Sequence, residues 1–114
     1  MEFMLLIYHQ ERSWLSLPDE SRSSIYKEYR DLAANLSQAG KQKAGGEFEP
    51  TLTAVTVRVR SGKRETTRGP FEETLEQLAG FFLIEAKDMD EAIAVAAQIP
   101  TARDGSVEVR PVRS

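Results

Sequence analysis

Residues 80–86, with the sequence Gly-Phe-Phe-Leu-Ile-Glu-Ala, constrain the fold most because apolar residues occupy successive positions. Neighbouring side chains of a strand point to opposite faces of its sheet, so a strand formed here is apolar on both faces. Such a strand needs cover on both sides. Amphipathic helices can cover one face, and we expect a second copy of the protein to cover the other.

Other strands are predicted from two kinds of pattern. Residues 3–8 are apolar throughout, like the central strand, whereas residues 53–60 and 106–112 alternate between apolar and polar side chains. Residues 61–63 form a short turn that joins 53–60 to a partner strand at 64–68. In the resulting hairpin we expect one wet face and one valine face.

Two helices are predicted from apolar residues at three- and four-residue spacing. The first covers residues 19–39, with Asp19 or Ser21 as its N-cap and Gly40 as its stop. Its buried stripe consists of Ile25, Tyr29, Leu32 and Leu36, flanked by Tyr26 and Ala33. The second helix begins at the cap Asp88 and ends at Pro100. Its buried stripe consists of Met89, Ala92, Ile93, Ala96 and Ile99.

Three connecting segments carry no clear periodic pattern. We expect residues 9–17 to form a loop that folds back over a pocket or an interface. Residues 44–50 read as a turn and a short extended piece, with two glycines that suggest close backbone approach or positive φ. Residues 72–78 could be a helical turn or an extended lead-in, and we favour the extended form after Thr74.

The order of these elements predicts a single α+β domain over residues 1–114, with a ferredoxin-like arrangement in which both helices cover one sheet face. The opposite face stays bare and apolar. Pairing two such sheets about a two-fold axis would bury about 1,600 Å² or more, the area of a standard protein interface. We expect Leu6 and Phe82 to contribute to that pairing.

Composition narrows the environment and the partners. The absence of cysteine excludes disulfides and thiolate chemistry and agrees with a reducing compartment, so we expect a cytoplasmic protein. No apolar run is long enough to span a bilayer, and the first residues do not resemble a secretory signal. A net charge of −3 argues against nonspecific nucleic-acid binding. The basic cluster at residues 58–68 is more typical of a solvated hairpin than of a phosphate site.

Several segments together resemble a known family. They are Arg68-Gly69-Pro70-Phe71, residues 80–86 and residues 105–111, in this order and at this spacing. They resemble the YCII-related family, in the branch named for an Asp-Gly-Pro-Phe (DGPF) motif, and the resemblance covers nearly the whole chain. It implies a dimeric α+β barrel built from ferredoxin-like subunits. It also implies a small bacterial protein of uncharacterised function, in a family with some members linked to alternative sigma factors.

The chain departs from the family pattern at positions that could carry chemistry. Arg68 replaces the Asp that names the branch, which exchanges an acceptor for a permanent cation. Some family members carry a His and an Asp on the first helix, and by spacing Tyr29 and Gln38 take those places here. Neither side chain titrates near neutral pH. The resemblance therefore transfers no catalytic residue to this chain.

The candidate site residues each have a functional and a structural interpretation. His9, the one histidine, could act as a general base or could simply be a solvated loop residue. Tyr26 and Tyr29 could line a ligand pocket between helix and sheet or belong to the core. Glu47 could accept from a ligand or pair with Arg58 or Arg68. With one histidine and no cysteine, we expect no metal site and no cofactor.

Three hypotheses for function follow. The first is a homodimer that binds a small apolar or anionic molecule in a cleft, without strong catalysis. The second is a weak acid-base enzyme that uses His9, with Tyr29 and Arg68 orienting the substrate or stabilising charge. The third is an accessory partner in sigma-factor-linked transcriptional control, which rests on the resemblance alone.

Overall fold

The two-sided apolar strand lies inside a four-stranded sheet. In the computed structural model, which describes residues 1–113, β5 (Gln77–Glu85) lies between β2 (Gln42–Glu47) and β1 (Glu2–His9). On the other side of β1, β6 (Ser106–Pro111) forms an edge. All neighbouring strands are antiparallel. The architecture is α+β and is consistent with the predicted ferredoxin-like arrangement.

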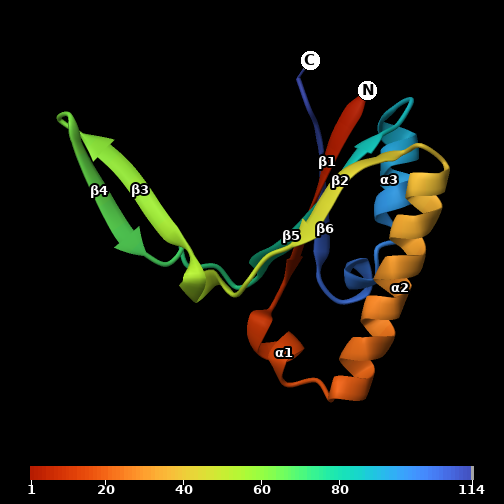
Figure 1. The fold of residues 1–114 in the computed structure, drawn as a ribbon, viewed down its shortest axis with the longest axis horizontal. Helices are drawn as coiled ribbons and strands as arrows, with labels where there is room; N and C mark the ends of the chain where they lie inside the picture. Colours follow the sequence, from red (N-terminus) through yellow and green to blue (C-terminus); the bar gives the residue numbers. More distant parts are fainter. Residues whose placement is uncertain (114) are drawn as a thin grey trace.

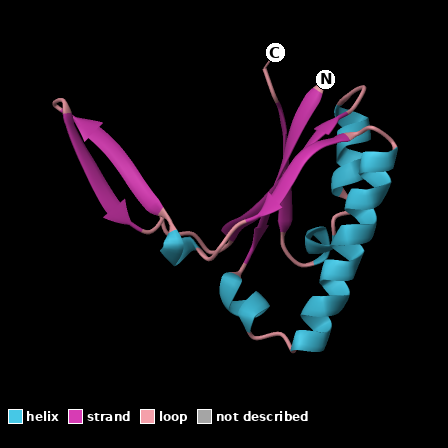
Figure 2. Cartoon of the chain, in the orientation of Figure 1, coloured by secondary structure: helices cyan, strands magenta, loops and turns pink. Residues whose placement is uncertain are grey.

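The two long helices lie on the same side of this sheet (Figure 1, Figure 2). They are α2 (Asp19–Gln38) and α3 (Met89–Ala96), and a third, short helix, α1 (Glu11–Leu15), follows β1. The core between sheet and helices consists mainly of Phe3, Leu5, Ile7, Phe82 and Ile84 from the strands and Leu32, Leu36, Ala92, Val95 and Ala96 from the helices. The prediction that both helices cover one sheet face is therefore confirmed.

No helix of residues 1–113 covers the opposite sheet face (Figure 1). Its apolar side chains, here called the bare face, are Met4, Leu6, Phe81 and Leu83, which are all partly exposed. Phe82 is not among them, because it pairs with Leu5 in the register of β1 and β5 and points to the helices. The expectation that Phe82 lies in a sheet-to-sheet interface is therefore wrong, whereas Leu6 does lie on the bare face.

The edge strand next to β5 is not the one that alternation predicted. The glycine-rich segment expected to be a turn forms β2, whereas β3 (Val55–Arg60) and β4 (Lys63–Arg68) pair only with each other. Of the two glycines of β2, Gly45 is the one that the packing requires, because it lies opposite Phe82. A Cβ on Gly45 would approach a ring carbon of Phe82 to 3.1 Å. Glycine carries no apolar signal, so the pattern could not reveal this strand.

The helices depart from the sequence predictions at four places, and the first is the end of α3, which stops at Ala96 and not at Pro100. The predicted loop at residues 9–17 contains α1, and the N-cap of α2 is Pro18, so Asp19 and Ser21 both lie inside the helix. The stripe of α3 is rotated: Val95 is buried, whereas Met89 and Ile93 are 36% and 51% exposed. The buried residues of α3 are Ala92, Val95 and Ala96, whose i, i+3, i+4 spacing puts them on one side of the helix.

Other boundaries match the predictions. Asp88 caps α3 and accepts a hydrogen bond from the Glu91 amide at 2.9 Å. Gly40 follows α2 with a φ of 70°. No helix forms in residues 72–76, but the chain bends at Leu75 and Glu76, so the predicted extended form begins only at Gln77 with β5. In the described part of the chain, no helix has both the length and the apolar character needed to cross a membrane.

A pair of glycine substitutions tests the close approach of β2 to β5. A Cβ on Gly80 would lie 2.6 Å from the Gly46 carbonyl oxygen, so the strands would have to separate. A Cβ on Gly46 would lie 3.5 Å from Phe81, an ordinary contact. We expect Gly80→Ala to lower the free energy of unfolding by about 1–3 kcal/mol. Gly46→Ala serves as the control and should change it by less than about 0.5 kcal/mol. Urea denaturation measures both, and equal costs would contradict the packing described here.

Candidate functional site

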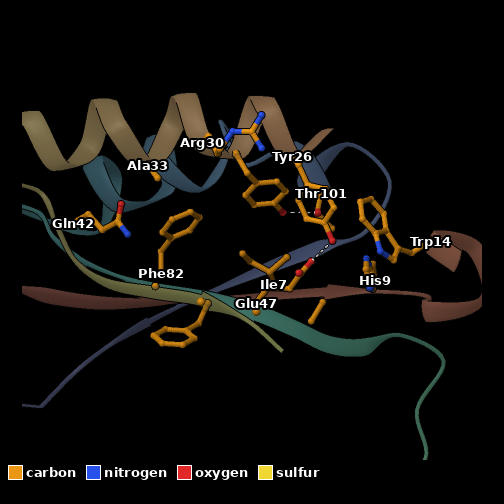
Figure 3. A pocket seen from close by; sticks show the side chains of 16 residues that line it. Ile7, His9, Trp14, Tyr26, Arg30, Ala33, Gln42, Glu47, Phe82 and Thr101 are labelled. Carbon is orange, nitrogen blue, oxygen red and sulfur yellow. Dashed lines mark hydrogen bonds between the residues drawn. The ribbon is translucent and has the colours of Figure 1, made fainter. Parts of the chain in front are cut away.

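A cavity of about 300 Å³ lies between α2 and the sheet (Figure 3). We call it the aromatic cavity. Its walls come from six elements, and its lining includes His9, Trp14, Tyr26, Tyr29, Arg30, Ala33, Gln42, Glu47, Phe82 and Thr101. Three glycines, Gly45, Gly46 and Gly80, lie along its sheet side. The volume is at the lower end of the range typical for small-molecule sites.

The inner end of the cavity is built on Tyr29 and Phe82. Their rings stack with centroids 6.3 Å apart and an interplanar angle of 17°. The Tyr29 hydroxyl lies 2.5 Å from Oγ1 of Thr101, which belongs to the 3-10 helix η2 (Pro100–Arg103). Burial raises the pKa of Tyr29, although the hydrogen bond with Thr101 opposes this. Tyr29 is therefore protonated at neutral pH and held in a fixed orientation.

The outer end of the cavity is a chain of aromatic contacts that ends on a carboxylate. His9 stacks on Trp14 with centroids 5.7 Å apart, and Trp14 meets the edge of Tyr26 at 5.4 Å. The Tyr26 hydroxyl donates to Oε2 of Glu47 at 2.8 Å. Burial, together with the hydrogen bond and the charge of Glu47, raises the pKa of Tyr26 to about 12. Tyr26 is thus a neutral phenol that orients the Glu47 carboxylate.

His9 is kept neutral by its surroundings. It lies on the same face of β1 as Ile7, so its ring enters the cavity rather than the solvent. Burial lowers its pKa, and this outweighs the opposing charges of nearby carboxylates, which belong to Glu11, Asp104, Glu47 and Glu76. The His9 ring forms no hydrogen bond with any other group in residues 1–113. A neutral imidazole with an unused lone pair can accept a proton or a hydrogen bond.

The short helix α1 is fixed in place by Glu11. Its carboxylate accepts hydrogen bonds from the Thr51 amide at 2.7 Å and from the Thr51 hydroxyl at 3.1 Å. The Glu11 amide in turn donates to Oε1 of Gln77 at 2.9 Å. These contacts tie α1 to β5 and to the 3-10 helix η1 (Thr51–Thr53). They hold Trp14 over the cavity although α1 itself has no buried residue.

The structure brings together four of the six residues predicted from the sequence. His9, Tyr26, Tyr29 and Glu47 all line the aromatic cavity. Two others, Arg58 and Arg68, do not line it and lie on the β3–β4 hairpin. The suggested pairing of Glu47 with either arginine is therefore wrong, because Glu47 bonds to Tyr26 and the hairpin points away from the sheet.

Among the cavity residues that the sequence did not indicate as site residues, Trp14, Arg30, Gln42 and Thr101 carry groups able to form hydrogen bonds. Arg30 is one helical turn after Tyr26, so the i, i+4 spacing could have placed it on the same side. Trp14, in the short helix after His9, carried a weaker signal. Gln42 and Thr101 gave none, because each reaches the cavity through the tertiary fold. Oε1 of Gln42 is buried and has no hydrogen-bond partner in the described chain. A buried acceptor without a partner is available to a ligand or to water.

The chemical groups of the cavity suit binding and proton transfer rather than metal chemistry. Within residues 1–113 no three His, Cys, Asp or Glu side chains gather closely enough to hold a metal ion. The available groups are a neutral imidazole, phenol hydroxyls, one carboxylate and the Arg30 guanidinium. Flat aromatic rings form the walls between them.

Comparison with known proteins gives a family match, a relative by sequence and an alignment with a solved structure. A family model described as "YCII-related domain" matches residues 1–114. An uncharacterised protein of Rhizobium meliloti (strain 1021) is 32% identical over 114 residues, covering 98% of this chain and 92% of its own length. The chain also aligns with 5-chloro-2-hydroxyhydroquinone dehydrochlorinase of Burkholderia phenoliruptrix AC1100, solved in complex with 2,5-dihydroxybenzoquinone. That alignment has 15% identity, a TM-score of 0.49, and coverage of 99% of this chain and 94% of the other.

The fluorescence of Trp14, which stacks on His9, should report the charge state of His9. Trp14 is the sole tryptophan, and an imidazolium formed against it would change its emission. Because burial lowers the pKa of His9, we expect a fluorescence transition with a midpoint below 6.5, which is absent in His9→Gln. The free energy of unfolding should fall as the pH drops through 6.5 and level off below the folded-state pKa. A midpoint at or above 6.5 would contradict the buried position of His9.

Proposed function

The chain belongs to the YCII-related family, and from that premise we propose that it is a homodimer that binds a small, flat organic molecule in the aromatic cavity. The observation that carries the proposal is the combination of aromatic walls with polar groups that lack protein partners. Oε1 of Gln42 is buried without a partner, and the His9 ring is neutral and unbonded in the described chain. A buried acceptor such as Oε1 of Gln42 is usually satisfied by a protein group, a ligand or an ordered water.

The walls select the shape of the ligand. Tyr29 and Phe82 stack at one end, and Trp14 and Tyr26 meet at the other, so a planar ring can contact aromatic surface at both ends. Arg30 supplies a cation at the rim, which suits an anionic substituent such as a carboxylate. We infer that the ligand is an aromatic acid or a phenol of a size near that of a single ring.

A second candidate function is acid-base catalysis by His9. The lowered pKa of His9 favours this function, because a base that is neutral at physiological pH can accept a proton from a bound hydroxyl. Tyr26, with a pKa of about 12, would then serve as a hydrogen-bond donor and not as the base. The link to alternative sigma factors that the family resemblance implies stays a prediction.

Filling the cavity tests ligand binding. Ala33 lines the cavity from α2, so Ala33→Leu should occupy the space without removing a core side chain. Ala34, the next residue, is exposed and outside the cavity, which makes Ala34→Leu a matched control. With salicylate or 4-hydroxybenzoate at about ten times Kd, we expect the Tm of the wild type to rise by about 6 °C. Ala34→Leu should keep this rise and Ala33→Leu should lose it. Equal shifts in the two variants, or none in the wild type with any aromatic acid or phenol, would contradict this site.

We further propose that two copies pair through their bare faces to form a dimeric α+β barrel. The support is the partly exposed apolar surface of Met4, Leu6, Phe81 and Leu83, on the face that no helix covers. Such pairing leaves the aromatic cavity open, since the cavity is on the helix side of the sheet.

A charge on the bare face tests the pairing. Leu6→Glu would place a carboxylate without a partner in the middle of the interface, so we expect the dimer Kd to rise about 100-fold or more. Ile93→Glu makes a similar change at an exposed position on α3, away from the bare face, and should leave the Kd unchanged. Sedimentation velocity over a range of concentrations measures both. The same dimer Kd in Leu6→Glu and the wild type would overturn the pairing.

A further inference from the structure

The β3–β4 hairpin stands apart from the rest of the molecule. We call residues 55–68 the arm, and its strands pair with each other and with no strand of the main sheet. Figure 1 shows the arm projecting from the end of the sheet where β2 and β5 meet their connections. Its base is closed by hydrogen bonds from the Gly69 amide to the Ala54 carbonyl at 2.7 Å and from the Thr56 hydroxyl to the Gly69 carbonyl at 2.8 Å. The arm is thus a defined element and not an irregular loop.

One face of the arm is an exposed apolar row. Val55, Val57 and Val59 alternate along β3 and are 61%, 57% and 61% exposed. Side chains directly opposite across an antiparallel pair share a face, so Arg64 and Arg68 stand beside the two end valines. A two-stranded hairpin is marginally stable in water unless something packs against it. In this chain nothing does, because the described body reaches the arm at its base alone.

The direction of the arm decides what can cover it. In Figures 1 and 2 the helices α2 and α3 lie on one side of the sheet, and the arm extends to the other side. The arm therefore shares its side of the molecule with the bare face. A body seated on the bare face would lie beside the arm.

We propose that the arm clasps a second copy of this chain, with the valine row packed on the body of the copy that is seated against the bare face. The inference rests on the bare-face pairing proposed above and adds a second contact to it. A two-fold axis makes the contact reciprocal, so each copy contributes one arm and receives the other. Arg68, which does not reach the aromatic cavity, becomes an interface residue.

Charge favours another copy of this chain as the occupant. The arm carries five Lys or Arg residues and one Glu, whereas the whole chain has a net charge of −3, so the remainder of the chain is distinctly acidic. Arg64 and Arg68 border the valine row and would meet that acidic body. A strongly basic partner would be repelled by the arm, and nucleic acid would be repelled by the acidic body, so neither complements both surfaces.

Isosteric substitutions test the valine row without changing the shape of the arm. Replacing Val55, Val57 and Val59 by Thr keeps β-branched side chains but makes the row polar. We expect the Kd of self-association in sedimentation velocity to rise about 100-fold. Thr67→Val, on the opposite face of the arm, serves as the control and should leave the Kd unchanged. The arm is outside the core, so the thermal unfolding of the diluted triple variant should match that of diluted wild type.

Hydrogen exchange gives an independent measurement and separates the two proposals. If the arm clasps a copy, its amides in residues 55–68 should exchange more slowly as the protein concentration rises through the dimer Kd. One outcome would overturn the arm contact and leave the bare-face pairing intact. In it, Leu6→Glu disrupts the dimer, the exchange of the arm amides does not change with protein concentration, and the Kd of the triple variant equals that of the wild type. A wild type that stays monomeric up to about 100 μM would overturn both.

Discussion

The packing of β1 and β5 against each other is the interaction on which the rest of the structure depends. These strands form the centre of the sheet and are apolar on both faces, so each face needs cover. On one face the cover is α2 and α3, and Phe82 both fills the core there and stacks under Tyr29. The same strand pair thereby builds the hydrophobic core, positions the inner end of the aromatic cavity and leaves Leu6 and its neighbours on the bare face.

The aromatic cavity lies between glycines on the sheet side and aromatic side chains on the helix side. Gly45 and Gly80 allow β2 to approach β5 closely, because a Cβ on Gly45 would lie 2.9 Å from Nε2 of Gln42 and a Cβ on Gly80 would lie 2.6 Å from the Gly46 carbonyl oxygen. Aromatic rings from α1 and α2 close the space on the other side. Burial then sets the charge states: it lowers the pKa of His9 and raises those of Tyr26 and Tyr29. A neutral acceptor and neutral donors in an apolar surrounding suit a small organic ligand better than a metal ion.

The cavity and the proposed interface use opposite faces of one sheet. Phe82 points to the helix side and Phe81 to the other, one residue apart on β5. A ligand in the cavity and a second copy on the bare face therefore do not compete for space. The arm belongs to the second of these surfaces, because it extends to the side without helices. The separation means that the substitutions at Ala33 and at Leu6 probe independent properties.

The sequence by itself determined the elements whose stability depends on a local, periodic pattern. Apolar spacing located both long helices and the central strands, Asp88 marked a helix cap, and the strand–helix order predicted the α+β fold with one bare face. It also proposed four of the cavity residues, among them His9 and Glu47. The tertiary structure alone decided that a glycine-rich segment is the edge strand, that the alternating hairpin leaves the sheet, and that Gln42 and Thr101 enter the cavity. The physical reason is that periodicity shows only which side of an element is buried. Which elements pack together depends on how well their shapes fit, as Gly45 fits against Phe82.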